Sequence, residues 1–417
     1  MNNSTFLIFY FAFLTLNLTG CFSSSIGQPE TPLSTTPTSP ASVAASPVSL
    51  PESTDNKDLL QQSWVAYRQQ FIQNDGRVID REGGDRSTSE GQAYAMLRAF
   101  FINDRDTFAK TLNWAENNLQ RQTNGKRSDN LWAWKWGRDA TGKWGILDRN
   151  FASDADVDVI TSLILASRAW NRPEYLTLAR TKLRDLWMLS TITVPSGTRY
   201  LLPGPKEAFQ PQPSIIKLNP SYLAPYAFRL FAQVDPAHDW LSLVDSSYQV
   251  LENSAQLSAV KLPSDWVILD TETGQFQPLP SSDPLKTQYG FDAYRVWWRV
   301  ALDAAWFKSP QALQFLRQHM TPLQEQWRTQ QKIPAQIDLQ GQPIVDYEAT
   351  SQYAMVYAAL RLIDPATAEQ ILQRKLLPSY KNGIWDNDSA YYAQNLAWLG
   401  LMSPTTVTAQ LLKPNGQ

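Results

Sequence analysis

The sequence contains very little histidine and cysteine. Its 417 residues include two histidines, His238 and His319, which lie far apart and form no ligand-spaced pair. A histidine-rich zinc or iron site is therefore not expected, and a Ser-His-Asp triad would have to use one of these two. The single cysteine, Cys21, excludes an intrachain disulfide. No glycine-rich phosphate loop is present, so we expect no cofactor and no metal, and chemistry carried by carboxylates, tyrosine or arginine.

An excess of charge of one sign is also lacking. The formal net charge is -2, which gives no electrostatic footprint for a nucleic-acid partner. Hydrophobic residues make up 43% of the chain, enough for a large buried core. Aromatic residues are abundant, with 16 Trp, 16 Tyr and 17 Phe. This many aromatic rings suit a groove in which flat ligands stack.

The N-terminal segment predicts export. Residues 6–16 form an apolar run that is too short to span a bilayer and is typical of a signal peptide. Leu18-Thr19-Gly20-Cys21 follows and resembles a bacterial lipobox, in which the cysteine is lipidated and becomes the mature N-terminus. The segment before the apolar run departs from the usual pattern because it has no Lys or Arg. We expect a lipid-anchored protein on the periplasmic or cell-surface side, with ordinary cleavage and secretion as the alternative.

Three regions are predicted: a signal peptide with lipobox over 1–21, a disordered Ser/Thr/Pro linker over 22–54, and a folded domain over 55–417. The folded part shows mostly helical spacing of apolar residues, which favours an all-α toroid or a layered helical array. β signals are short, at 267–269 and 344–345. Helices are expected at 221–233, 239–252, 291–307, 310–328, 349–362, 366–373 and 390–401, in addition to runs near Tyr94, Phe108 and Ile160.

Glu90 follows Thr88-Ser89 and precedes an apolar helical run. The simpler interpretation is a first-turn glutamate that complements the helix dipole below a Ser or Thr cap. The alternative is a general acid. The two make opposite demands, because a helix start lowers the pKa of a carboxyl group whereas a proton donor needs a raised pKa. For Glu90 to act as an acid, burial and a nearby second carboxylate would have to raise its pKa by more than the helix start lowers it.

Asp154, Asp156 and Asp158 form a D-x-D-x-D pattern. An EF-hand calcium loop that starts at Asp154 would need Gly at its sixth position and Glu at its twelfth, where this chain has Val159 and Leu165. A metal–nucleotide site would need a phosphate-binding companion, and none is present. Helix capping remains the simpler interpretation for Asp156 and Asp158 even if Asp154 is catalytic.

Four tryptophans crowd the segment between these acids: Trp132, Trp134, Trp136 and Trp144. A core could hold one or two of them, but four with charged residues interleaved are more easily placed along a cleft. Aromatic faces stack on the apolar face of a pyranose ring. We therefore predict that Trp132 and Trp134 bind substrate, together with Tyr94 on the helix after the first acid.

The segment 290–299 forms a third constellation. Asp292 and Arg295 lie three residues apart and share a face on a helix. A surface ion pair is the simpler interpretation, but Phe291, Trp297 and Trp298 are too apolar for a solvated face. A buried or cleft-lining pair is expected instead.

Taken together, these segments resemble glycoside hydrolase family 8 over most of 60–400. The family's Ser-Glu-Gly-Gln acid motif, its Ala-Ser/Thr-Asp-Ala/Gly-Asp signature and its Tyr-Asp-Ala-x-Arg-x-x-Trp-Arg pattern have counterparts here. Departures are small: Phe291 stands where the family often has Tyr, and Trp297 where it often has Pro. The matching segments are 89–92, 133–135, 152–156, 219–222 and 291–299.

The resemblance implies an (α/α)6 barrel and an inverting mechanism. Glu90 would be the general acid and Asp292 the base that activates water. Asp154 would grip the sugar at the cleavage point, while Tyr222 and Arg295 position the water and keep Asp292 ionised. An inverting enzyme needs space for that water, so the two carboxyl groups should lie about 6.5–9.5 Å apart.

The expected activity is that of an endo-acting β-1,4-glycanase, first of all on a β-glucan such as cellulose, as a monomer. Xylan or mixed-linkage glucan is the nearest alternative, because no motif reports the backbone. A non-catalytic carbohydrate-binding lipoprotein would keep the tryptophans without needing the acids. A polysaccharide lyase would need positive charge to hold a uronate, which this chain lacks. The sequence leaves open whether such a glucanase would digest external polysaccharide or trim an exported glucan.

Overall fold

The structure is a computed structural model that describes residues 54–413. The predicted signal peptide, the lipidation at Cys21 and all but the last residue of the predicted linker lie outside the described residues and stay predictions. Helix α1 (Thr54–Phe71) opens the described part. None of the helices in 54–413 is long and apolar enough to cross a membrane.

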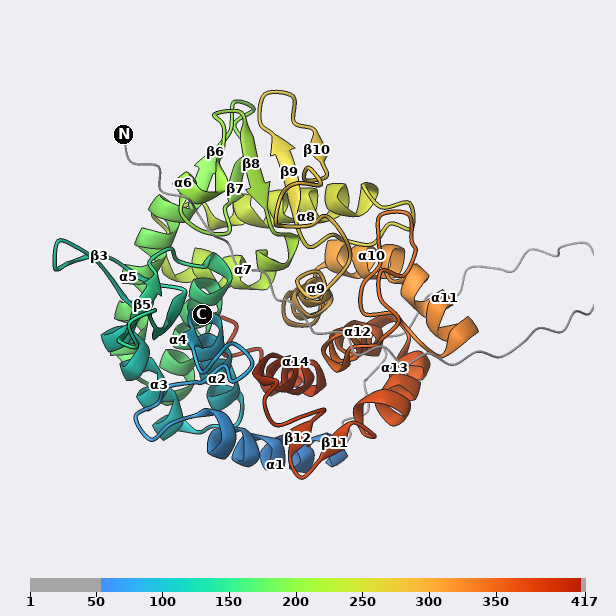
Figure 1. Cartoon of the computed structure of the whole chain (residues 1–417), viewed down its shortest axis with the longest axis horizontal. Helices are drawn as coiled ribbons and strands as arrows, with labels where there is room; N and C mark the ends of the chain where they lie inside the picture. Colours follow the sequence, from blue (N-terminus) through green and yellow to red (C-terminus); the bar gives the residue numbers. More distant parts are fainter. Residues whose placement is uncertain (1–53, 414–417) are drawn as a thin grey trace, which may run out of the picture. The chain divides into compact units, whose positions relative to one another are not determined.

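Six helices pack side by side in a closed inner ring. Each contacts the next along the chain, and the last packs against the first. Figure 1 shows these helices around the centre of the ring. They are α2 (Ser89–Phe101), α4 (Ser153–Trp170), α7 (Pro225–Val234), α9 (Tyr294–Phe307), α12 (Thr350–Ile363) and α14 (Tyr391–Leu401).

An outer helix packs against each inner one, which gives a toroid of helical pairs. This confirms the predicted all-α toroid and the (α/α)6 barrel that the family resemblance implied. The outer helices are α1, α3 (Arg105–Asn118), α5 (Pro173–Ser190), α8 (Trp240–Gln256), α10 (Pro310–His319) and α13 (Pro365–Ile371), with α11 (Thr321–Gln330) and the one-turn α6 (Lys206–Phe209) added to them.

The two rings differ in burial because they differ in sequence pattern. In α4 every residue from Ser153 to Ser167 is buried, as expected for a helix that is covered on all sides. In α5 only a stripe is buried, including Tyr175, Ala179 and Leu186, at spacings of three to four residues. The inner ring therefore forms the core, and any polar group on it must find a partner inside the barrel.

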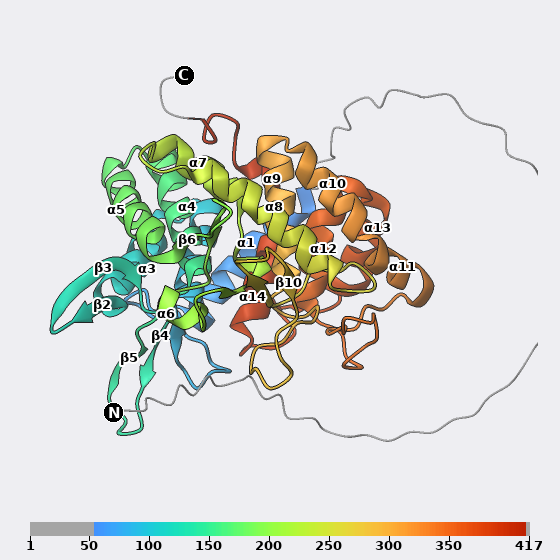
Figure 2. The same cartoon turned by 90° about the horizontal axis from the view of Figure 1, so that it is seen from above.

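Short strands lie in the segments that connect the helices of the ring. A three-stranded sheet of β1 (Ser87–Thr88), β4 (Lys135–Arg138) and β5 (Trp144–Asp148) pairs Thr88 with Lys135 directly before α2. Figure 2 shows β4 and β5 extending from one edge of the ring. The remaining strands are β2 (Gln120–Thr123), β3 (Lys126–Trp132), β6 (Thr191–Thr193), β7 (Arg199–Leu201), β8 (Ile215–Leu218), β9 (Val267–Asp270), β10 (Phe276–Gln277), β11 (Tyr380–Lys381) and β12 (Ile384–Trp385).

Several local predictions are corrected. The strand expected at 267–269 is confirmed as β9, whereas 344–345 forms no strand. The helix expected over 310–328 is two helices that meet at Met320, because Pro322 favours the first turn of a new helix. The helix expected over 221–233 begins at Pro225 for the same reason. The helix expected from residue 291 begins at Tyr294, so Asp292 lies in the turn before it.

Candidate active site

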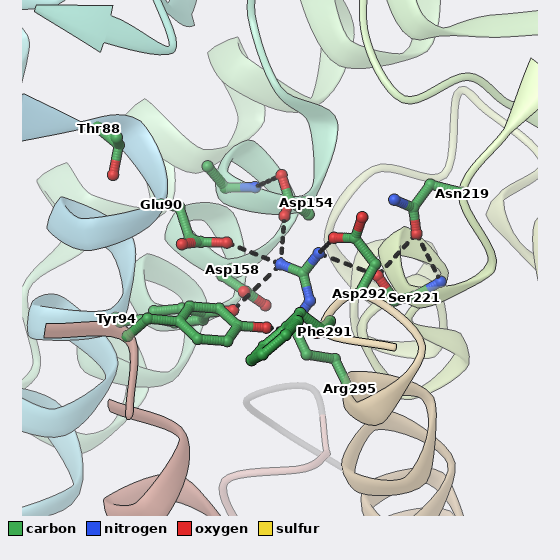
Figure 3. A network of polar contacts seen from close by, with 12 residues as sticks. Thr88, Glu90, Tyr94, Asp154, Asp158, Asn219, Ser221, Phe291, Asp292 and Arg295 are labelled. Atoms are coloured by element: carbon green, nitrogen blue, oxygen red, sulfur yellow. Dashed lines mark hydrogen bonds and ion pairs between the residues drawn. The ribbon is translucent and has the colours of Figure 1, made fainter. Parts of the chain in front are cut away.

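Local structure fixes Glu90 at the start of α2. Thr88 is the N-cap, and its side-chain oxygen accepts a hydrogen bond from Gly91 N at 3.0 Å. The backbone N of Ser89 donates to Trp134 O at 3.0 Å, which ties the helix start to the segment before β4. The Glu90 side chain is 20% exposed. The predicted cap is therefore present, and it directs the Glu90 carboxyl group toward the polar centre of the barrel (Figure 3).

One guanidinium joins the three predicted catalytic carboxylates. Arg295 Nη1 lies 2.8 Å from Glu90 Oε2 and 2.8 Å from Asp154 Oδ2. Its Nη2 lies 2.6 Å from Asp292 Oδ1. Figure 3 shows the carboxylates converging on Arg295 from three different elements. The negative charge of the three carboxylates is thus balanced in part by Arg295, whose side chain is only 2% exposed.

This shared guanidinium limits the separation of the predicted acid and base. Glu90 Oε2 and Asp292 Oδ1 are bound to the two terminal nitrogens of one planar group, at 2.8 and 2.6 Å. Given the size of a guanidinium, these two oxygens lie no more than about 8 Å apart. The bound excludes a separation beyond the window of about 6.5–9.5 Å expected of an inverting enzyme, and the lower end of that window stays a prediction.

Asp292 is the most exposed of the three carboxylates. Its side chain is 32% exposed, against 20% for Glu90 and 2% for Asp154. Its second oxygen, Oδ2, accepts a hydrogen bond from Trp266 Nε1 at 3.0 Å. The Trp266 indole stacks on Phe209 with ring centroids 5.8 Å apart. Asp292 is thereby held at both oxygens while part of its side chain remains open to solvent.

Burial raises the pKa of Glu90 to about 7, with the Arg295 charge acting in the opposite direction and the Asp154 charge adding to the increase. The second oxygen of Glu90 accepts a hydrogen bond from Tyr391 OH at 3.0 Å. Burial raises the pKa of Tyr391 well above its usual range, so its hydroxyl keeps its proton. Burial thus outweighs the helix start, and the pKa of Glu90 is raised in the direction that a proton donor needs.

The three aspartates of the D-x-D-x-D pattern bind different partners. Asp158 lies one turn beyond Asp154 on α4, and Arg299 one turn beyond Arg295 on α9. Arg299 binds both Asp158 oxygens, at 2.8 and 2.9 Å, below the first cluster. Asp156 points elsewhere, toward Trp132 N at 3.3 Å, and burial raises its pKa to about 8. Helix capping, the simpler interpretation of this pattern, is therefore wrong, because α4 has Ala152 at its N-cap and no side-chain cap. Asp156 and Asp158 make core contacts instead.

We expect the Arg299–Asp158 pair to matter for stability. Arg299→Met leaves the fully buried Asp158 carboxylate without its ion pair and should lower the free energy of unfolding by about 3–5 kcal/mol. Glu325→Gln, which breaks the exposed pair with Arg328, is the control and should cost no more than about 1 kcal/mol. Unfolding in guanidinium chloride measures both. Equal, small losses in the two variants would contradict a structural role for the pair.

Two residues predicted to bind substrate have no exposed surface. Trp132 is fully buried, and its Nε1 donates to Glu116 Oε1 at 2.8 Å, behind the wall of the site. Tyr94 is also fully buried, and its hydroxyl accepts from Arg295 Nη1 at 3.3 Å. Neither can touch a ligand directly, which corrects the prediction. Tyr94 supports the guanidinium, and Trp132 joins the core because β3 carries it inward.

Trp134 and Tyr222, the other predicted binding residues, are partly exposed. Tyr222 ends the short helix η1 (Pro220–Tyr222), and its ring lies 5.3 Å from the Arg295 guanidinium carbon. Trp136 and Trp144 stack on each other across β4 and β5 at 4.8 Å. The cluster predicted as one cleft wall is therefore divided between the core, the site margin and a hairpin.

Sequence reasoning missed four partners of the acidic cluster. Ser221 Oγ accepts from Arg295 Nη2 at 3.0 Å, and Asn219 Oδ1 orients that serine at 2.7 Å. Trp266 and Tyr391 bind the outer oxygens of Asp292 and Glu90. Asn219 and Ser221 lie in the segment 219–222 that resembles the family and could have been predicted from it. Trp266 and Tyr391 lie in no such motif. Within 54–413, no group of three or more His, Cys, Asp or Glu side chains is placed to hold a metal ion.

Comparison with known families gives one match to a family model. The model described as glycosyl hydrolases family 8 matches residues 41–406. An endoglucanase of Xanthomonas axonopodis pv. citri is 38% identical over 244 residues, 58% of this chain and 60% of that protein. An endoglucanase of Escherichia coli (strain K12) is 33% identical over 241 residues, 58% of this chain and 62% of that protein. The aligned segments thus span less than two thirds of the relatives' own length.

Solved structures share the fold over most of the chain. An endo-1,4-D-glucanase from Vibrio fischeri ES114 superposes with a TM-score of 0.69 at 28% identity, and the match covers 81% of this chain and 93% of that one. A β-1,3-1,4-glucanase from Paenibacillus sp. X4 gives a TM-score of 0.70 at 16% identity, with 86% and 95% covered. The second likeness concerns the fold alone.

Proposed function

The chain belongs to glycosyl hydrolases family 8, and on that premise we propose that it is an inverting, endo-acting β-1,4-glucanase. The observation that carries the proposal is the single buried guanidinium of Arg295, which contacts Glu90, Asp154 and Asp292 together. Two carboxyl groups held apart at one site are what glycosidic hydrolysis requires.

Glu90 acts as the general acid in this proposal. With a pKa of about 7, it carries a proton at mildly acidic pH and can donate it to the glycosidic oxygen as the bond breaks. Arg295 and Tyr391 hold its two oxygens. The Tyr391 hydroxyl can accept as well as donate, so its hydrogen bond to Glu90 persists whether or not Glu90 carries the proton.

Asp292 acts as the general base. Both of its oxygens accept hydrogen bonds, from Arg295 and from Trp266, and these contacts fix the orientation of the carboxylate. It removes a proton from a water that attacks the anomeric carbon on the face opposite to the leaving oxygen. The product is the α-anomer when the bond cleaved is a β-linkage.

Asp154 and Tyr222 complete the site. Asp154 Oδ2 shares Arg295 Nη1 with Glu90, which places the two carboxyl groups side by side. Its Oδ1 accepts from its own helix, at Ala155 N, and in the free protein it holds Arg295. That Asp154 also grips the sugar stays a prediction. Burial raises the pKa of Tyr222 well above its usual range, so Tyr222 offers a neutral hydroxyl beside Asp154 and Asp292.

A β-1,4-glucan is the proposed substrate because relatives that match the chain are named endoglucanases. Xylan and mixed-linkage glucan are the alternatives within the family. A binding protein without catalysis would not need a buried acid with a raised pKa beside a partly exposed second carboxylate. Export, with lipid attachment at Cys21, is proposed from the sequence alone and is testable by fatty-acid labelling of wild type and Cys21→Ala.

The test is hydrolysis of soluble cellulose derivative, xylan, mixed-linkage glucan and chitosan. We expect reducing ends to appear from the cellulose derivative, with viscosity falling early because internal bonds are cut. Proton NMR of a short cello-oligosaccharide should show the α-anomer forming first. Initial formation of the β-anomer would refute inversion, and the absence of cleavage on every backbone would favour a binding protein.

A further inference from the structure

A buried carboxylate that the mechanism above does not use lies beside the proposed base. Asp265 is 7% exposed and precedes β9. Its Oδ1 accepts a hydrogen bond from Ala293 N at 2.8 Å, directly after Asp292. Its own backbone N donates to Gln288 O at 2.7 Å, just before the same turn. Asp265 thus binds the backbone on either side of the segment that carries Asp292.

The turn approaches Asp265 unusually closely. A Cβ atom placed on Gly290 would lie 2.6 Å from Asp265 Oδ2, a distance that real side chains do not tolerate. Gly290 is therefore needed because of close approach and not because of a left-handed backbone. The glycine at the head of the segment 290–299 thus has a specific purpose, which is to let the turn sit on the Asp265 carboxyl group.

The residue after Asp265 holds the base itself. Trp266 Nε1 donates to Asp292 Oδ2 at 3.0 Å, and the indole is fixed by stacking on Phe209 with an interplanar angle of 6°. Two adjacent residues thus act on one target, Asp265 on the backbone of the turn and Trp266 on the carboxylate. Arg295 supplies the remaining contact, to Oδ1.

We propose that Asp265 and Trp266 are positioning residues that aim Asp292 at the attacking water. The inference rests on the proposed function, because it takes Asp292 to be the general base. The first backbone N–H groups of a helix have no intrahelical partner and need an acceptor from elsewhere. Here Asp265 caps the turn, and Trp266 restricts the side chain that extends from it.

Asp265 acts on the turn that holds Asp292 through hydrogen bonds and not through its charge. Burial raises the pKa of Asp265 well above its usual range, with the Asp292 charge adding to the increase and the Arg295 charge opposing it. The other titratable groups that face Asp265 are neutral hydroxyls, those of Tyr289, Tyr294 and Tyr392. An amide at this position would keep an oxygen for Ala293 N, whereas alanine would not.

The first test compares Asp265→Ala with Asp265→Asn on a soluble cellulose derivative. We expect Asp265→Ala to lower kcat by up to about 10²-fold with KM nearly unchanged, because a small displacement of a catalytic group costs that much. Asp265→Asn should restore most of the rate. Asp303→Asn is the matched control. It removes a buried carboxylate about two and a half turns from the start of α9, where Asp303 pairs with Arg229. This control should lower thermal stability and leave kcat unchanged.

The second test uses Trp266→Phe and remains informative if Asp265→Ala fails to fold. Phenylalanine keeps the stacking on Phe209 but removes the donor to Asp292 Oδ2. Because a carboxylate that loses a hydrogen-bond donor holds a proton more readily, the acidic limb of kcat/KM should move to higher pH. A residue with a merely structural role would not move this limb.

Asp292→Asn is measured in parallel to separate the two hypotheses. If Asp292→Asn stays active, the assignment of the base in the proposed function fails. If Asp292→Asn is inactive while Asp265→Ala and Trp266→Phe both keep the wild-type kcat and acidic limb, only the present inference is overturned. Loss of rate in Asp265→Ala, rescue in Asp265→Asn and a shifted limb in Trp266→Phe would support it.

Discussion

Glu90→Gln should lower kcat on a β-1,4-glucan by about 10³- to 10⁴-fold, since the variant has no proton to give to the leaving oxygen. The amide is nearly isosteric and can still accept from Arg295 Nη1, so KM should change little. Reducing-end release at saturating substrate measures the effect. Glu252→Gln is the matched control: it makes the same chemical change in α8, next to His319, and should keep the wild-type kcat.

The pH profile adds a second signature of the acid. Glu90 must be protonated to act, and burial raises its pKa to about 7, so wild-type activity should fall as pH rises through about 7. The residual activity of Glu90→Gln should not show this fall, because an amide does not titrate. If the variant kept wild-type activity, or lost it with the same alkaline limb, another group would have to be the acid.

Arg295→Lys should lower kcat by about 10²- to 10³-fold, the loss expected when a preorganised charged donor is removed. The guanidinium uses Nη1 for Glu90 and Asp154 and Nη2 for Asp292. A lysine ammonium is a single point charge and cannot hold both sides of the site at once. An ammonium that no longer contacts Glu90 lowers the pKa of Glu90 less than the Arg295 guanidinium does, so the alkaline limb should move above about 7.

Arg299→Lys is the control for this experiment. It weakens the second buried pair, with Asp158, one turn further from the site. It should lower the unfolding temperature while the alkaline limb stays in place. If Arg295→Lys and Arg299→Lys behaved alike in kcat and in pH profile, the shared guanidinium would have no special part in catalysis.

Sequence reasoning could predict the local structure around Glu90 because its partners there are close in sequence. Thr88, Glu90 and Gly91 lie within one helical turn, and the cap that they predict is the cap that forms. Helical periodicity likewise located α8, α12 and α14 within a few residues, since apolar spacing reports directly on a packed helix face. Family resemblance supplied what periodicity could not, the closing of the helices into a barrel.

The network around the acids could not be predicted in the same way. Arg295 meets Glu90 across 205 residues and Asp154 across 141, and no spacing rule connects such positions. Asp265 and Tyr391 are single residues whose partners exist only after packing. The prediction that Trp132 binds substrate failed for a related reason. An aromatic ring suits a sugar-binding surface and a core equally, and only its burial in the folded structure distinguishes the two.

The hydrogen bond between Glu90 and Tyr391 joins the first and last helices of the inner ring, 301 residues apart. Such a contact forms only after the intervening chain has been ordered, and contacts of large sequence separation are slow to form. Helices can therefore form early during refolding, whereas the hydrogen bond from Tyr391 to Glu90 forms only when α14 docks on α2. Under the proposed function, recovery of hydrolysis should report ring closure, and a chain truncated before α14 should be rich in helix and lack the Tyr391 contact to Glu90.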